Sequence, residues 1–507
     1  MVTDHSIIPD AIIESLKSSE KNGVCIVANN ISYTYEQLLN DVSKAEPWLQ
    51  SMGINAQTKI VMAVPASYEF LIAFYALYRR GVTMALIDPQ MGRKNYNALC
   101  KQFEPDTLVA DSRIVLLNEH PVARWIIEQL NTFLPSVNYN SIKRIITTGK
   151  KLPILQKHFH LDKRRGYNSS PLRSHPSETT LLTYTSGTLG QPKGVEHTAS
   201  SLVNSLAVVN TMLNKERDKR LATHLPHFML IFTYFGGETH LWPENLSAKQ
   251  RYHFIEKHRI TTFFGPPSEI LPLVNYAIEL RIKLPSVLKH IILGSAPTHT
   301  SFLEKLSGVT EADITCIYGM TENLVASTAN GKEKQGYKGI GDFVGRIVPG
   351  VKIKINDDHE ILIQSPQLFR GYHLQEPRQG WHHTGDLGRV ENNNLILIGR
   401  KKDMIIRKNK NIYPALYEPI ITQIAGIDEA ALVGIYDEKS HDEEVFLVVD
   451  SKENIDVVNL KKLLSHGPFQ IDKDVLPDKI FQMPIPKTGR QLKVDKVKLK
   501  ELLKARI

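Results

Sequence analysis

Cysteine is scarce in this chain, which has only Cys25, Cys100 and Cys316 among its 507 residues. The three lie too far apart for a metal-ligand motif, and an odd number leaves no complete set of disulfides. This scarcity excludes a disulfide-stapled scaffold and favours a reducing, cytoplasmic setting.

Long apolar runs are also missing. No stretch reaches the ~18 apolar residues that a membrane-spanning helix needs. The most apolar run, HFMLIFTYFGGETHLW, is short and is broken by Gly236 and Gly237. The first residues, MVTDHSIIPDAIIESLKSS, lack the basic start and apolar core of a secretory signal. We therefore expect no integral membrane segment and no signal peptide.

Concentrated charge is rare as well, although the formal net charge is +9. Lysine and arginine are scattered, apart from one dense patch, GRKKDMIIRKNK, at residues 399–410. Such a run is typical of a solvated basic face or of a site for anions. No nucleic-acid-reading motif accompanies it, so we expect small anionic ligands and no nucleic acid.

Strand-like runs alternate with helical patterns over most of the sequence. KIVMAVP at 59–65 and TMALIDP at 83–89 read as buried strands, and the apolar segment 67–81 between them reads as a helix. This order predicts βαβ units and a largely parallel sheet, hence an α/β fold. Short β-like pieces follow from about Val344. About 105 residues remain after a boundary at Arg400 to Lys402, enough for a small α+β domain. Residues 1–400 are thus expected to form one domain and residues 401–507 another.

A glycine- and hydroxyl-rich loop stands out at 181–198, LLTYTSGTLGQPKGVEHT. It predicts a strand, a loop and then a helix beginning near Thr198. Glycines let backbone N–H groups approach an anion, and Lys193 adds a charge suited to phosphate. It is not a Walker A loop, because Pro192 precedes the lysine and Gly194 follows it. A flexible surface loop is the alternative reading.

The loop resembles the phosphate loop of the adenylate-forming (AMP-binding) superfamily of acyl-CoA synthetases, luciferases and peptide-synthetase adenylation domains. The resemblance implies that ATP phosphates contact Thr185, Ser186, Gly187, Thr188, Gly190 and Lys193. It also implies a catalytic contribution from Thr185. Leu189 departs from the family, which usually has Thr or Ser there.

A second motif, IYGMTEN at 317–323, is similar to the family's adenine motif. The resemblance implies that Tyr318 stacks on adenine, with Gly319 beside it. Thr321 then meets the α-phosphate and Glu322 holds Mg²⁺, a role that suits a hard oxygen ligand. A buried tyrosine and a helix-capping threonine are the alternative reading.

A third motif, HHTGDLGRV at 382–390, resembles the family's T-G-D-L segment. The resemblance implies that Asp386 accepts hydrogen bonds from the ribose hydroxyls. Arg400 lies fourteen residues further on, at the family's spacing, and reaches the ribose or phosphate region. An aspartate in an ordinary G-D turn is the alternative.

The C-terminal part resembles the family's hinge and catalytic-lysine segments. Lys402 matches the hinge residue, and Asn409 stands where the family usually has a glycine beside the pantetheine tunnel. Matching KVDK to the family's ending makes Lys493 the catalytic lysine. That match needs a one-residue insertion and puts Leu492 in place of a glycine. Lys487 and Arg490 are rival candidates, and a plain basic face is the alternative.

Two further segments, TTFFGPPSEI and LGSAP, resemble strands that line the family's acyl and adenine pockets. The residues assigned there by resemblance are Phe264, Gly265, Gly294, Ser295 and Ala296. Met229 and Met320 are assigned to the acyl side, where a flexible thioether suits an apolar chain. Plain core packing is an equal alternative for Met229.

The resemblance covers nearly the whole chain. It implies a large domain with mixed and parallel sheets and a β-rich subdomain, followed by a small mobile α+β domain. The implied activity is ATP- and Mg²⁺-dependent conversion of a carboxylic acid, fatty or otherwise apolar, to an acyl-adenylate, with CoA as acceptor. Parts of the chain also resemble olefin β-lactone synthetases, which adenylate a β-hydroxy acid and close the ring without CoA. A degenerate, non-catalytic nucleotide-binding relative is the third possibility.

Overall fold

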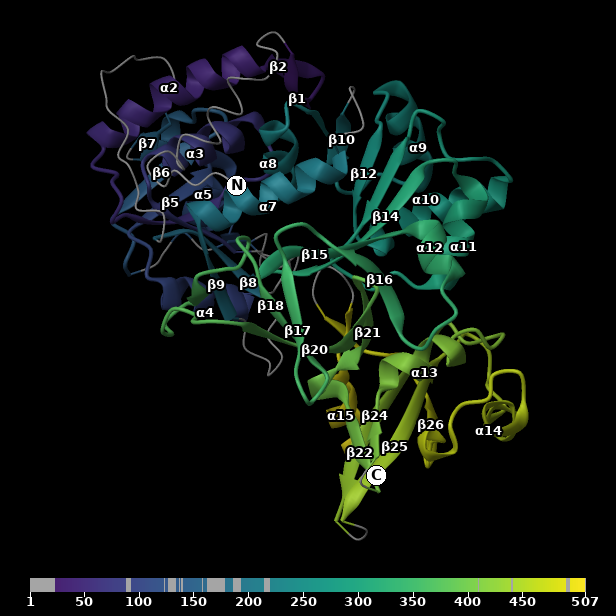
Figure 1. Cartoon of the computed structure of the whole chain (residues 1–507). Helices are drawn as coiled ribbons and strands as arrows, with labels where there is room; N and C mark the ends of the chain where they lie inside the picture. Colours follow the sequence, from purple (N-terminus) through teal and green to yellow (C-terminus); the bar gives the residue numbers. More distant parts are fainter. Residues whose placement is uncertain are drawn as a thin grey trace.

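The chain folds into a large α/β body followed by a smaller C-terminal body in the computed structural model (Figure 1). The structure describes residues 23–87, 93–122, 124–125, 134–135, 137, 140–156, 158–161, 178–185, 193–213, 219–408, 410–438, 441–488 and 493–506. We call the described residues up to Arg400 the large body and those from Lys401 the small body. Within these ranges, no helix is both long and apolar enough to cross a membrane.

One sheet of the large body is built from the predicted βαβ units. Its strand order is β19-β9-β8-β4-β3-β5-β6-β7, and the six strands from β8 to β7 run parallel. The helices α3 (Tyr68–Arg79) and α4 (Arg93–Phe103) connect β3 to β4 and β4 to β5. The strands are β3 (Lys59–Ala63), β4 (Thr83–Leu86), β5 (Thr107–Asp111), β6 (Arg144–Thr148), β7 (Phe159–His160), β8 (Thr179–Thr185), β9 (Lys193–Thr198) and β19 (Gly371–Tyr372). After β5 come α5 (Ser112–Glu119) and the 3₁₀ turn η2 (Pro153–Leu155).

Helix α3 lies at the centre of the largest apolar core. It is apolar on every side, and its residues from Phe70 to Tyr78 are all buried. Ser67 caps its first turn by accepting a hydrogen bond from the Phe70 amide at 3.1 Å. The helix packs against α2 (Tyr35–Ser51) and α8 (Pro226–Tyr234). Directly after it, the buried Arg80 pairs with Glu46 of α2 at 3.0 Å and also donates to the Ile54 carbonyl.

The second sheet of the large body has thirteen strands and a change of character along its width. Its order is β17-β18-β20-β21-β16-β15-β14-β13-β12-β10-β11-β1-β2. The strands from β14 to β1 run parallel, whereas those from β15 to β17 are antiparallel and form the β-rich part expected after Val344. The strands are β1 (Val24–Ala28), β2 (Ile31–Thr34), β10 (Arg220–Thr223), β11 (Glu238–Leu241), β12 (Thr262–Gly265), β13 (His290–Leu293), β14 (Asp313–Met320), β15 (Asn323–Asn330), β16 (Asp342–Ile347), β17 (Lys352–Ile355), β18 (Glu360–Gln364), β20 (His382–Glu391) and β21 (Asn394–Arg400). Its other helices are α7 (Ala199–Leu213), α9 (Ala248–Lys257), α10 (Pro267–Leu280), α11 (Thr300–Val309) and α12 (Gly331–Gly336).

The segment after the glycine-rich loop differs from the sequence prediction. We expected the loop to lead directly into a helix near Thr198, but strand β9 comes first and pairs antiparallel with β8, with Thr185 opposite Lys193. The helix, α7, begins at Ala199. Four consecutive residues of β9 are buried, so the strand lacks the apolar–polar alternation that would have revealed it.

A buried carboxylate holds β9 to β19. Glu196 accepts hydrogen bonds at 2.7 Å each from Thr179, from Arg370 and from the ring of His373. Burial alone acts to raise the pKa of Glu196, but these three hydrogen bonds outweigh it and lower the pKa to about 2. Backbone hydrogen bonds reinforce the link, from Arg370 N–H to the Glu196 carbonyl and from His373 N–H to the Gly194 carbonyl.

The small body has its own sheet and its own cores. β24 (Glu429–Asp437) pairs antiparallel with β25 (Asp442–Asp450), which runs parallel to β26 (Lys479–Gln482). Separate apolar clusters lie on the two faces of this sheet. The remaining elements are η3 (Lys401–Asp403), β22 (Ile405–Arg407), β23 (Lys410–Ile412), α13 (Pro414–Ile421), α14 (Val457–His466), η4 (Lys473–Val475), β27 (Lys487–Thr488), β28 (Lys493–Val494) and α15 (Lys496–Lys504).

The Arg80–Glu46 pair gives a stability prediction. Both side chains are almost fully buried, so Glu46→Gln removes a charged partner that contacts the guanidinium at 3.0 Å. We expect unfolding in urea to show a loss of about 3 kcal/mol. Glu36→Gln, an exposed change in the same helix, should cost less than about 1 kcal/mol. Equal losses in the two variants would contradict the assignment.

The Glu196 network gives a pH prediction. The folded-state pKa, about 2, lies below the ordinary value of 4.5, so the carboxylate stabilises the fold fully above about pH 4.5. This contribution, on the order of 3 kcal/mol, is lost as the pH falls from 4.5 towards 2. In chemical denaturation we expect Glu196→Gln to be less stable than the parent protein at pH 7, with the gap narrowing between pH 5 and pH 3. The exposed change Glu304→Gln should show no such convergence.

Candidate active site

Asp386 occupies the centre of the candidate site. It is buried, and its two carboxylate oxygens have different partners. Oδ2 accepts a hydrogen bond from the phenol of Tyr318 at 2.8 Å, and Oδ1 forms an ion pair with Nε of Arg400 at 2.9 Å. The nearby Asp386 charge raises the pKa of Arg400 despite partial burial. Each carboxylate oxygen has a second lone pair, so Asp386 keeps capacity for further donors.

Local structure explains how Asp386 is presented. It lies on β20 directly opposite Arg400 on β21, so the two motifs fourteen residues apart become a cross-strand pair. Before it, Gly385 adopts a positive φ of 71°, which favours glycine. The hydroxyl of Thr384 accepts a hydrogen bond from the Asp386 amide at 3.0 Å and donates one to the Ile361 carbonyl at 2.8 Å. The T-G-D motif is therefore an irregular stretch within β20 that orients the Asp386 carboxylate.

The adenine motif forms a tight hairpin between β14 and β15. Thr321 and Glu322 are its two connecting residues, so the structure does not make Thr321 a helix cap. Gly319 sits at an irregularity in the strand pairing, where a Cβ would come 2.0 Å from the Leu324 carbonyl oxygen. Only glycine fits there. Tyr318 before it is buried, and burial followed by the Asp386 charge raises the pKa of its phenol, which keeps the proton it donates.

Glu322 belongs to a second group of contacts beside Asp386. Its Oε1 accepts a hydrogen bond from the phenol of Tyr372 at 2.9 Å, and its backbone carbonyl accepts one from the Phe369 amide at 2.9 Å. Lys193 places its ammonium 5.0 Å from the centre of the Tyr372 ring. Tyr372 was missed by the sequence analysis, which matched its segment to the family without assigning it a role. No sequence signal links it to Glu322 or Lys193, because both contacts are long-range.

The small body brings Lys493 to this group. Burial of the ammonium lowers the pKa of Lys493, the charge of Arg400 adds to this effect, and the Asp386 carboxylate opposes it. Lys402 and Glu322 also lie close enough to act on the Lys493 charge. The residue nonetheless keeps solvent-exposed surface. The charge of this lysine from the last β-ribbon is therefore influenced by Asp386, Arg400 and Glu322 of the large body.

The rival Lys487 lies on the same ribbon but points elsewhere. Lys493 is opposite Thr488, and Lys487 is opposite Val494, so the two lysines project from opposite faces. Lys487 instead forms an ion pair with Glu429 of the small body at 3.0 Å. Arg490 and Leu492 lie outside the described residues.

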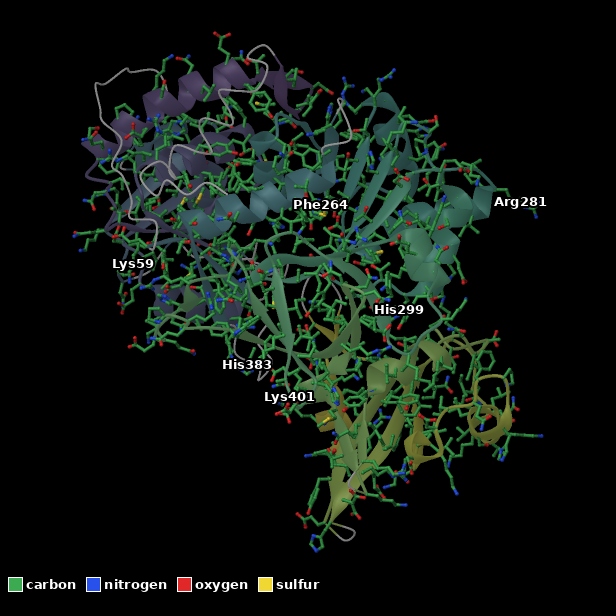
Figure 2. The ribbon with its side chains drawn as sticks, viewed as in Figure 1. Lys59, Phe264, Arg281, His299, His383 and Lys401 are labelled. Atoms are coloured by element: carbon green, nitrogen blue, oxygen red, sulfur yellow. The ribbon has the colours of Figure 1, made fainter. Side chains whose placement is uncertain are left out.

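The basic patch at 399–410 is largely paired with acidic groups. Lys401 contacts Asp358 and Glu360 of the large body at 3.0 and 3.4 Å. Figure 2 shows Lys401 near His383, whose ring also faces Glu360. Arg407 and Lys410 pair instead with Asp478 and Asp474 of the small body. Lys402, the predicted hinge residue, is exposed on η3 between these two sets.

The predicted acyl side is only partly assembled as expected. Phe264 lies inside the large body (Figure 2). Its ring packs edge-on against that of Phe228 of α8, with 4.8 Å between the ring centres. Met229, the next residue of α8, is fully buried in the core around α3, so the structure places it with the core and not beside Phe264. Met320 packs against the same apolar cluster as Phe264.

The strand ends near Phe264 contain the remaining assigned residues. Gly294 donates its amide to the Gly265 carbonyl at 3.2 Å, which joins the ends of β13 and β12. Ser295 then adopts a positive φ of 67°, a conformation that non-glycine residues rarely hold outside functional or turn sites. Ala296 follows and is partly buried.

Part of the predicted phosphate loop lies outside the described residues. This applies to Ser186, Gly187, Thr188, Leu189 and Gly190. Thr185 is described as the last residue of β8, opposite Lys193. Asn409, beside the predicted pantetheine tunnel, also lies outside.

The chemistry of the group fits a magnesium nucleotide. Arg400 pairs with Asp386, Lys193 lies over the ring of Tyr372 that binds Glu322, and the charges of Lys402, Asp386 and Glu322 act on Lys493. Among the described residues, Glu322 forms no ion pair, and its one side-chain hydrogen bond occupies one oxygen. A carboxylate with a free oxygen beside an anion-binding region is the donor set that Mg²⁺ takes together with phosphates.

Comparisons with known proteins show what the whole chain is similar to. The medium-chain acyl-CoA ligase ACSF2 of Rattus norvegicus, a mitochondrial protein, is 22% identical over 489 residues, covering 87% of this chain and 79% of the relative. The solved amide bond synthetase McbA from Marinactinospora thermotolerans matches with a TM-score of 0.81 at 20% identity, over 98% of this chain and 99% of that one. The O-succinylbenzoate coenzyme A synthetase of Bacillus subtilis, solved with ATP and magnesium ion, matches with a TM-score of 0.76 at 18% identity, over 98% and 99% of the two chains.

The two structural matches bear out the predicted α/β fold with its two-body architecture. The family model described as AMP-binding enzyme matches residues 15–373, which is more than half of the chain. The protein therefore belongs to the AMP-binding enzyme family.

Proposed function

We propose that the protein is an adenylate-forming ligase that activates an apolar carboxylic acid with ATP and transfers the acyl group to the thiol of CoA. One observation carries the proposal. Asp386 of the T-G-D motif is bonded to Tyr318 of the adenine motif through one oxygen and to Arg400 through the other, so residues from three separate segments meet at one carboxylate.

In the first step, a carboxylate oxygen of the acid attacks the α-phosphorus of ATP, and the bond to pyrophosphate breaks. Both reactants are anionic, so the protein must supply positive charge and alignment. Asp386 accepts hydrogen bonds from the ribose hydroxyls, while Tyr318 and Arg400 hold its carboxylate in place. Lys193 of the large body and Lys493 of the small body offset the negative charge of the phosphates. Glu322 would hold Mg²⁺, which would supply further positive charge to the phosphates.

In the second step, the CoA sulfur attacks the acyl carbonyl and AMP leaves. We propose that the small body, residues 401–507, rotates about Lys402 between the steps and withdraws Lys493. Support comes from the separate cores of the two bodies and from the position of Lys402 at their junction. The name of the rat relative, a medium-chain acyl-CoA ligase, supports CoA as acceptor.

An apolar acid is favoured by the aromatic pair on the acyl side. Phe228 and Phe264 meet there, with Met320 in the same apolar cluster. Apolar and aromatic walls bind an apolar acyl chain through the hydrophobic effect.

The activity itself can be tested by ATP–pyrophosphate exchange over a panel of acids. The panel contains fatty acids of graded length, aryl acids and β-hydroxy fatty acids. We expect exchange with apolar acids and an acyl-CoA product by mass spectrometry when CoA is added. An amide product with an added amine would show that an amine, and not CoA, is the acceptor. A β-lactone formed without CoA would show that the hydroxyl of the acid itself is the acceptor. Absence of exchange with every acid would reject the adenylation proposal.

The identity of the catalytic lysine can be tested on the same assay. We expect Lys493→Ala to lower the exchange rate by about 100-fold or more, the loss typical of removing one charge-stabilising donor. Lys487→Ala removes a lysine from the same ribbon that pairs with Glu429, so it serves as the matched control. Exchange should remain within about threefold of the parent rate there. The reverse pattern would move the role to Lys487.

A further inference from the structure

Tyr372 occupies a position that the proposed function does not yet use. It lies on β19, a two-residue strand that pairs with β9, so that Tyr372 is opposite Val195. Its neighbours are tied down on both sides. Arg370 and His373 bind the Glu196 carboxylate, and the Phe369 ring meets the Tyr372 ring edge-on at 5.0 Å. The ring is therefore held by packing and by backbone pairing before any ligand arrives.

Two charged residues of the site meet this fixed ring. The phenol donates to Oε1 of Glu322 at 2.9 Å, and the ammonium of Lys193 stands 5.0 Å from the ring centre. Glu322 and Lys193 otherwise come from distant elements, the β14–β15 turn and the start of β9. Tyr372 is the described side chain that contacts both.

The two contacts differ in chemistry. The hydrogen bond occupies one carboxylate oxygen of Glu322 and fixes the carboxylate plane, which leaves the other oxygen available. The aromatic face attracts the lysine charge without neutralising it, unlike a carboxylate partner. One residue thus orients an acidic group and a basic group while leaving the charge of both free for a ligand.

We propose that Tyr372 is a positioning residue that fixes Glu322 for a divalent cation through its hydroxyl and Lys193 for the nucleotide phosphates through its ring. The proposal rests on the proposed function for the identity of the ligand, magnesium ATP. It adds that cation binding and phosphate binding depend on separate parts of one side chain, so that the two effects can be separated by substitution.

The test measures ATP affinity by calorimetric titration, once with Mg²⁺ and once with EDTA. The ratio of the two affinities reports the contribution of the metal and needs no turnover. Tyr372→Phe keeps the ring and loses the hydroxyl. We expect the ratio to fall about tenfold or more, the effect of losing one hydrogen bond to a charged group, with affinity in EDTA unchanged.

Tyr372→Leu removes the ring as well. We expect it to lower the affinity for ATP in EDTA by about threefold in addition, because Lys193 loses its aromatic partner. If Tyr372→Phe and Tyr372→Leu gave the same affinities in both buffers, the ring would have no role, and that half of the proposal would be overturned.

A double-mutant cycle tests whether the hydroxyl acts through Glu322. In a Glu322→Gln background, adding Tyr372→Phe should change the affinity ratio no further, whereas independent effects would add. Tyr417→Phe is the matched control, because it removes a similar phenol–carboxylate hydrogen bond to Asp472 in the small body. It should leave the ratio unchanged.

An unchanged ratio in Tyr372→Phe, with the melting temperature equal to that of the parent protein, would overturn the proposal. Failure of the proposed function is a different result, namely no pyrophosphate exchange by the parent protein. Because the titration detects nucleotide and metal binding alone, it reports on Tyr372 in either case. If Tyr372→Leu does not fold, Tyr372→Phe and the cycle still decide the role of the hydroxyl.

Discussion

The candidate site depends on one buried carboxylate whose two oxygens both have partners. Arg400 stands directly opposite Asp386 on the next strand and pairs with one oxygen, and Tyr318 donates to the other. A buried carboxylate without such partners would be strongly destabilising. The pairing joins the adenine motif, the T-G-D motif and the last strand before the small body. A change at any of the three residues therefore disturbs the others.

Around this carboxylate the protein gathers more positive than negative charge. Within the described part of the chain, Lys193, Arg400, Lys402 and Lys493 are the cations of this group, and Asp386, Glu322 and Asp403 are the carboxylates whose charges act on them. Repulsion among the cations lowers the pKa of Lys493 in addition to the effect of burial. A polyanionic ligand, such as the triphosphate of the proposed nucleotide, would relieve this repulsion.

Much of the fold could be predicted from local pattern. The βαβ units and helix α3 follow from periodicity within short stretches, whereas Asp386 and Arg400 were assigned by resemblance to the family's motifs. Strand β9 could not, because both of its faces are covered. Phe228 and Met229 are neighbours on one helix, and only packing decides which faces Phe264. Tyr372 meets Glu322 across fifty residues, a contact that no local pattern encodes.

The basic run at the junction divides its ion pairs between the two bodies. Lys401 pairs with acidic residues of the large body, whereas Arg407 and Lys410 pair with those of the small body. A swivel of the small body would leave both sets intact if the backbone turned only between Lys401 and Arg407. The run would then form one group of ion pairs with each body, and the rotation would be confined to the five residues between the two groups. Its length limits which torsions can carry the motion.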